Sequence, residues 1–190
     1  MNDTDIEICY LSASDTLKKY KEKKLSPVEV LSAVIKRIET VNPKINAFNY
    51  LDFDKSLELA KESEKKFSNN NDVLPLEGLP LAIKDEVNIK GQPNRNGCLL
   101  LKNNIAQKTD IDVETIVNSG AILHGRTTNP EFSLTSFCHS KLNGVTRNPW
   151  NLDMTPGGSS GGSAAALASG CAMLTTCLLY TSDAADEVSC

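Results

Sequence analysis

Glycine and serine are concentrated in one short stretch near the end of the chain, PGGSSGGSAAALASG from 156 to 170. Glycine lets a backbone adopt conformations that side chains forbid, and the alanine run that follows favours a helix. The stretch therefore predicts a tight loop that leads into a helix, with Gly170 just past the helix end. Such a loop can hold serine hydroxyls at a helix N-terminus, where they could take part in acyl transfer.

Two other interpretations of this stretch are a flexible linker and a phosphate-binding loop, because both are rich in glycine. The neighbouring segments disfavour a linker. Pro149 and Trp150 upstream indicate an anchored, ordered turn, and the alanine run downstream is compact. The P-loop motif needs a lysine that does not follow here, and the dinucleotide motif GxGxxG is also absent. Both nucleotide-binding interpretations are therefore weak.

A serine hydroxyl is a poor nucleophile until a base takes its proton. The sequence has two histidines, His124 in an apolar run and His139 in a polar one, and each is expected to be a hydrogen-bonded or surface residue rather than a catalytic one. The base would then have to be a lysine kept neutral by burial or by its neighbours. Lys84 is the candidate, because it follows the apolar run LPLAI, a predicted strand that could carry its amine inward.

The helix with the strongest start signal begins after Ser26. Pro27 suits the first helical position, and Glu29 completes a capping box with Ser26. Apolar residues then recur at helical spacing, which predicts an amphipathic packing helix. Asn42 and Pro43 are expected to end it.

Weaker patterns predict helices over about 15–24 and 54–67, and turn-forming residues at 68–72 mark a boundary. Beyond it, the apolar run 79–87, the helical pattern 112–120 and the apolar run AILHGR give strand, helix and strand in short succession. This order indicates an α/β sheet. The chain is thus expected to pair a helical hairpin with a sheet, without forming two independent domains.

Composition excludes several classes of function. The net charge is −4, and the lysine-rich segment 18–24 is interrupted and predicts a solvated helix face, so no nucleic-acid surface is expected. The chain shows no signal peptide and no apolar run of membrane-spanning length, which predicts a cytoplasmic protein. The cysteines are scattered and none forms a CxxC pair, so neither a disulfide framework nor a metal site is expected (Cys9, Cys98, Cys138, Cys171, Cys177 and Cys190).

Three segments together resemble the amidase signature family: LEGLPLAIKDEVNIKG at 76–91, GRTTNPEF at 125–132 and GVTRNPWNLDMTPGGSSGGSAAALASG at 144–170. They occur in the family's order, and the last is long enough to make chance agreement very improbable. The resemblance implies an α/β amidase signature fold with a central mixed sheet flanked by helices, here truncated and preceded by a helical hairpin. It also implies a carboxylic-acid amidase that needs no metal or cofactor.

The resemblance assigns roles to two residues. Lys84 matches the family's catalytic lysine, and Ser159 matches the bridging serine, which in the family follows a cis peptide bond. Protons would pass from a nucleophilic serine to Ser159 and on to neutral Lys84 during formation of an acyl-enzyme. Ser160 and Ser163 are expected to cap the alanine helix rather than to react.

The family's nucleophile is another serine, in a later GxDxGGS-Ile-Arg segment whose backbone N–H groups form the oxyanion hole. This segment is missing from the sequence. Asp183 occupies roughly the expected place, and Ser182 and Ser189 lack the glycine-rich context. The tail CLLYTSDAADE also resembles a translated adapter from transposase-based sequencing libraries.

The sequence therefore predicts an N-terminal helical region at 1–72, the first part of an amidase core at 73–176 and a non-native tail at 177–190. As given, the chain is expected to be inactive and poorly folded. The predicted function of the parent protein is hydrolysis of a small-molecule amide, with homodimerisation left open. One alternative is a glutamyl-tRNA amidotransferase A subunit, although the segment NPEFSLTSF argues weakly against it. A second is a fatty acid amide hydrolase, which would more comfortably carry a membrane-binding segment. The third is a non-catalytic remnant or scaffold.

Overall fold

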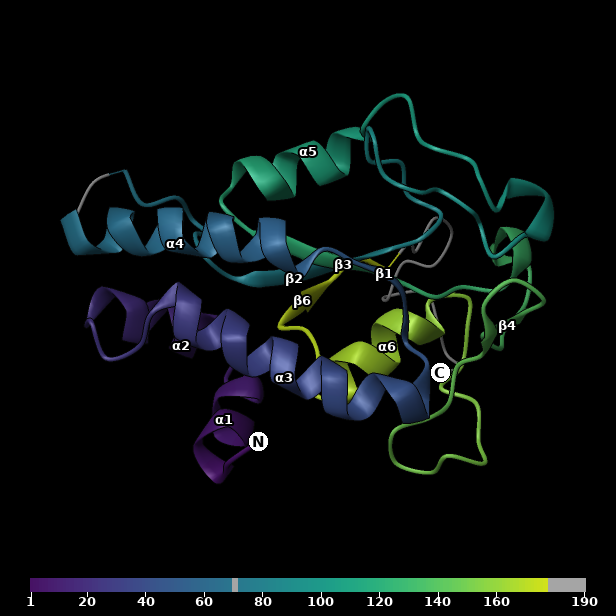
Figure 1. The fold of residues 1–190 in the computed structure, drawn as a ribbon, viewed down its shortest axis with the longest axis horizontal. Helices are drawn as coiled ribbons and strands as arrows, with labels where there is room; N and C mark the ends of the chain where they lie inside the picture. The colour runs from purple at the N-terminus through teal and green to yellow at the C-terminus, as the bar shows by residue number, and fades with distance from the viewer. Residues whose placement is uncertain (70–71, 178–190) are drawn as a thin grey trace, which may run out of the picture.

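A four-stranded mixed sheet forms the centre of the structure, a computed structural model that describes residues 1–69 and 72–177 (Figure 1). The strand order is β1 (Phe48–Leu51), β3 (Ile122–Thr127), β2 (Pro80–Lys84) and β6 (Leu174–Thr175). β2 is parallel to both β3 and β6, whereas β1 runs antiparallel to β3. The predicted α/β fold with a mixed central sheet is confirmed.

Helices cover both faces of this sheet. In Figure 1, α4 (Phe53–Asn69) and α5 (Ile111–Asn118) lie above it, while α3 (Pro27–Ile45) and α6 (Gly161–Ala168) lie below. The remaining elements are short: α1 (Asp3–Cys9), α2 (Ala13–Lys21), the 3-10 turns η1 (Leu99–Leu101) and η2 (Glu131–Ser133), and the hairpin of β4 (His139–Ser140) and β5 (Gly144–Val145). Among the helices in the described ranges, none is long and apolar enough to cross a membrane.

The start of α3 follows the sequence prediction. The amide of Glu29 donates to Ser26 Oγ at 3.2 Å, and the Glu29 carboxylate accepts from the Ser26 amide at 2.8 Å, which completes the capping box. The predicted end was wrong, because the helix continues through Pro43 to Ile45. Asn42 Oδ1 accepts the amides of Ala47 and Phe48, and Ile45 is buried, so packing and side-chain capping sustain the last turn.

Strand β1 joins the helical region to the sheet, and the sequence analysis did not predict it. It lies between α3 and α4, inside the segment expected to be helical, yet it pairs with β3. Its Phe48 is buried in one cluster with Ala82 of β2 and Ala165 of α6. The helices and the sheet therefore share a core.

His124 of β3 is fully buried, and within the described part of the chain neither of its ring nitrogens has a hydrogen-bond partner. The expectation of a hydrogen-bonded histidine was wrong at this position. Its ring lies 5.8 Å from that of Phe48, centroid to centroid. Burial lowers the pKa of His124 to about 4, because a charged imidazolium would lose its hydration there. His124 is therefore a neutral core residue at pH 7.

This burial makes the free energy of unfolding depend on pH. An unfolded chain protonates His124 below pH 6.5, whereas the folded chain does so only near pH 4. Above pH 6.5, His124 is neutral in both states and does not lower the free energy of unfolding. As the pH falls towards 4, protonation of His124 in the unfolded chain lowers the free energy of unfolding by about 3 kcal/mol. Urea unfolding at pH 7 and 4.5 should show a smaller loss in His124→Phe than in the unchanged chain. An equal loss in both would contradict the prediction, and the exposed His139→Gln is the control.

Candidate active site

Lys84 is the last residue of β2 and is fully buried. Its strand lies between two others, and its Cα is paired with that of Thr127 in β3. On the other side, the Lys84 amide donates to Thr176 Oγ1 at 3.1 Å. The apolar strand therefore carries the lysine to the interior, as the sequence predicted, and neighbours on both sides fix its backbone.

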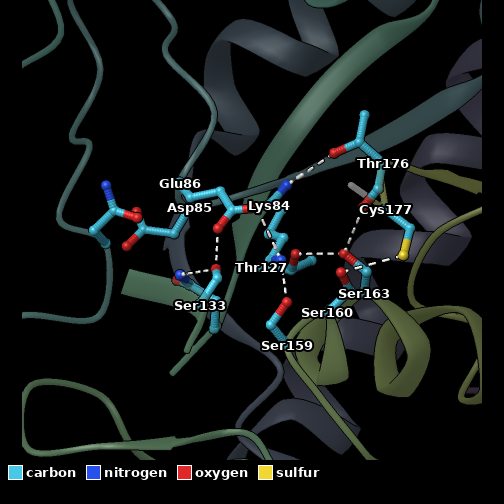
Figure 2. A network of polar contacts seen from close by, with 12 residues as sticks. Lys84, Asp85, Glu86, Thr127, Ser133, Ser159, Ser160, Ser163, Thr176 and Cys177 are labelled. Atoms are coloured by element: carbon cyan, nitrogen blue, oxygen red, sulfur yellow. Dashed lines mark hydrogen bonds and ion pairs between the residues drawn. The ribbon is translucent and has the colours of Figure 1, made fainter. Parts of the chain in front are cut away.

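Ser159 lies in the loop before α6, and its hydroxyl faces the Lys84 amine (Figure 2). Lys84 Nζ donates to Ser159 Oγ at 2.8 Å. The peptide bond between Gly158 and Ser159 is cis, the geometry that the family resemblance implied. The two residues singled out from the sequence are thus in direct contact, although 75 positions separate them.

Glycine is required around Ser159 because other backbone segments approach closely. A Cβ on Gly158 would lie 2.7 Å from the amide nitrogen of Phe137. A Cβ on Gly162 would lie 2.5 Å from the amide nitrogen of Thr128 and would also overlap the Thr128 carbonyl oxygen. Real Cβ atoms essentially never come so near, so the glycines allow the loop to lie against the backbone of 135–137 and α6 to lie against Thr128, just after β3.

Ser163 fixes the first turn of α6 to the sheet instead of capping the helix. Its Oγ lies 2.8 Å from Thr127 Oγ1 and donates to the Thr176 carbonyl oxygen at 3.0 Å. Ser160 occupies the N-cap position, but its side chain makes no capping hydrogen bond and instead accepts from Cys177 Sγ at 3.2 Å. The predicted capping role was therefore wrong for both serines.

A buried arginine shapes the turn that follows Lys84. The Arg126 guanidinium donates to the carbonyl oxygens of Lys84 at 3.1 Å and Asp85 at 3.2 Å, and also to that of Val87. Burial lowers the pKa of Arg126 to about 10, against the opposing effect of Asp85. Burial likewise raises the pKa of Asp85, against the effect of Arg126. These contacts hold the turn after β2 in one conformation.

Glu86 is the residue of this site that the sequence analysis missed. Its Oε1 lies 2.9 Å from Lys84 Nζ, and only 14% of its side chain is exposed. No local signal in the sequence marks this contact, because Glu86 lies in the turn after β2 and not in the strand. Lys84 thus has an acidic neighbour as well as Ser159.

Other residues singled out from the sequence lie away from the contact between Lys84 and Ser159. Trp150 is not an anchor, because 86% of it is exposed, although the turn that carries it is ordered by an Asn148–Asn151 bridge. His139 is exposed, as expected of a surface histidine.

A cavity of about 430 Å³ lies between α4 and α5, and neither Lys84 nor Ser159 lines it. The part of the chain that the structure describes holds no group of three or more residues suited to bind a metal.

The profile of the family described as Amidase matches residues 29–176, which include both members of the Lys84–Ser159 pair. The chain belongs to the amidase signature family. It is 40% identical over 158 residues to the glutamyl-tRNA(Gln) amidotransferase A subunit of Methylacidiphilum infernorum, a match that covers 83% of this chain and 31% of that protein. It is 38% identical over 160 residues to indoleacetamide hydrolase of Bradyrhizobium diazoefficiens, with 84% and 30% covered.

Solved structures of the amidase signature family have the same fold. A bacterial aryl acylamidase of the family superposes with a TM-score of 0.81 at 32% identity, over 86% of this chain and 34% of that one. Fatty acid amide hydrolase gives a TM-score of 0.87 at 28% identity, over 92% and 31%. The chain spans about a third of the length of the curated relatives it matches. Ser182, Asp183 and Ser189, the positions weighed for the nucleophile, lie outside the described residues.

Proposed function

We propose that this chain carries the base and the bridging serine of an amidase that hydrolyses a carboxylic acid amide to an acid and an amine or ammonia. The contact between Lys84 Nζ and Ser159 Oγ is the observation that carries this proposal, because a hydroxyl at 2.8 Å from a buried amine can exchange a proton with it. Family membership and a hydrolase relative support amide chemistry.

The proposed reaction is acyl transfer through a covalent intermediate. A nucleophilic serine attacks the amide carbon and gives its proton to Ser159 Oγ, while the hydroxyl proton of Ser159 passes to Lys84 Nζ. Reversing the relay delivers a proton to the leaving amine, and water then releases the acid. The GxDxGGS segment that supplies this nucleophile in the family is absent from the 190 residues.

The test begins at the source locus, read past the codon for Thr176. A frame that continues into a GxDxGGS segment provides the full protein, and release of ammonia from simple carboxamides then measures its activity. A locus that encodes the 190 residues and stops would contradict the hydrolase proposal, and would leave a remnant or a binding role.

In an active full protein, Ser159→Ala should lower kcat by about 10²-fold, because the relay loses its middle member. The matched control is Ser160→Ala. It removes a hydroxyl from the same loop, and this hydroxyl contacts Cys177 Sγ instead of Lys84. Steady-state kinetics with thermal melting would check both variants. If Ser159→Ala and Ser160→Ala had the same kcat, Ser159 would not be the bridge.

A second candidate function is release of ammonia inside a glutamyl-tRNA(Gln) amidotransferase. The 40% identical relative is the A subunit of such an enzyme, and this observation offsets the weak argument from NPEFSLTSF. Genes for partner subunits beside the locus, together with glutaminase activity that needs those subunits, would favour this function over that of a free-standing amidase.

A further inference from the structure

We propose that Glu86 is a positioning residue for Lys84, which aims the amine at Ser159 and stabilises the ammonium that forms when the amine accepts a proton. The proposal rests on the proposed function of the Lys84–Ser159 pair. Figure 2 shows the amine between the Glu86 carboxylate and the Ser159 hydroxyl, at 2.9 and 2.8 Å. A base held by a third group is the arrangement that activates serine nucleophiles in other hydrolases.

Glu86 is itself held by a second partner besides Lys84. Its Oε2 accepts a hydrogen bond from Ser133 Oγ, and Asn129 Nδ2 donates to that same Oγ at 3.1 Å. The backbone of Glu86 lies in the turn whose carbonyl groups Arg126 binds. The carboxylate is therefore fixed in place, and the two oxygens have separate partners.

The charged groups near the Lys84 amine belong to the turn after β2 and to β3. The turn after β2 contributes Glu86 and Asp85, and Asp85 Oδ2 accepts the Gly97 amide at 3.3 Å. β3 contributes Arg126, which binds carbonyl oxygens. The loop before α6, α6 itself and the segment after β6 contribute uncharged groups to the contacts of Figure 2: serine and threonine hydroxyls, the Thr176 carbonyl oxygen and the Cys177 thiol. Within residues 1–69 and 72–177, Glu86 is the one carboxylate within ion-pair distance of Lys84.

Two opposite effects on catalysis follow from this ion pair. The carboxylate stabilises the ammonium relative to the free amine, and only the free amine can act as a base. The same attraction favours the proton transfer from Ser159, because that step turns the amine into an ammonium beside Glu86. A carboxylate with a purely structural role would affect folding but would leave the pH profile in place.

The experiment titrates the Lys84 amine in the full protein encoded at the locus, with lysine labelled at Cε and the Lys84 signal assigned from its loss in Lys84→Arg. In Glu86→Gln, the amine should lose its proton at a lower pH, because the carboxylate that stabilises the ammonium is gone. The matched control is Glu58→Gln on α4, an exposed position that loses the same charge far along the chain. Thermal melting of each variant confirms that it folds.

Activity is measured on the same proteins. In Glu86→Gln, the acidic limb of the kcat/KM profile should move with the amine, and kcat on the plateau should fall about tenfold. If the titration of the Lys84 amine shifts in Glu86→Gln but the protein hydrolyses no amide, the proposed function is refuted and the pairing of Glu86 with Lys84 is not. An amine whose titration is unchanged would overturn the inference. If Glu86→Gln does not fold, Glu86→Asp, which keeps the charge but draws the carboxylate back from Lys84 Nζ, should shift the titration of the amine in the same direction by less. An unchanged titration in that variant would also overturn the inference.

Discussion

Replacing Lys84 with methionine or alanine should lower kcat of the full protein, in the amide hydrolysis proposed for it, by about 10³-fold. Lys84 Nζ is the basic group in contact with Ser159, so neither variant retains a group that can take the relay's proton. Methionine retains most of the buried volume, which separates the loss of the base from the loss of packing. Lys84→Arg should be inactive as well, because a guanidinium keeps the positive charge but does not give up its proton at neutral pH.

The measurement is steady-state hydrolysis of a carboxamide, with thermal melting to show that each variant folds. Lys90→Ala serves as the matched control, because Lys90 is exposed and lies six residues further along the same segment. A folded Lys84→Met enzyme with an unchanged kcat would show that Lys84 is not the base.

Gly162→Ala should destabilise the fold strongly, because the contact between α6 and β3 leaves no room for a methyl group. The new Cβ would meet the backbone nitrogen and the side-chain oxygen of Thr128 at 2.5 Å, and neither backbone can move without disturbing β3 or its continuation. Overpacking of this kind costs about 3 kcal/mol, which corresponds to a melting temperature lower by roughly 6–12 °C. In the full protein, any folded population should also lose the proposed activity, because the loop that leads into α6 would carry Ser159 away from Lys84.

Gly91→Ala provides the comparison for this prediction. Gly91 has a φ of 81°, and no atom lies within 4 Å of the position that a Cβ would take, so alanine there adds backbone strain without a clash. That strain costs about 1–2 kcal/mol. Equal melting temperatures for the two variants would mean that the close approach of α6 to Thr128 does not contribute to stability as argued.

Local signals in the sequence were enough to place the two central members of the site. The apolar run before Lys84 predicts a buried strand, and the glycines around Ser159 predict a tight loop before a helix; both are properties of a few consecutive residues. The contact between them depends on the sheet, and only the family resemblance brought them together. Strand order and burial had to come from the structure.

The features that the sequence did not yield depend on distant partners. β1 and β6 are short strands without their own pattern, and each exists because of its pairing with a neighbour. Glu86 resembles an ordinary turn residue until Ser133 is seen to bind it from 47 positions away. Trp150 shows the converse, because a large aromatic residue suggests burial and yet the turn leaves it in solvent.

The position of β2 between β3 and β6 has a consequence for the motions of the site. A strand bonded on both sides exchanges its amide hydrogens only through large openings, whereas a loop opens through small local ones. Lys84 lies at the end of such a strand, whereas Ser159 lies in a half-buried loop. We therefore expect β2 to fix the position of the Lys84 backbone, and we expect the fluctuations that make or break the proton path to arise in the loop that carries Ser159.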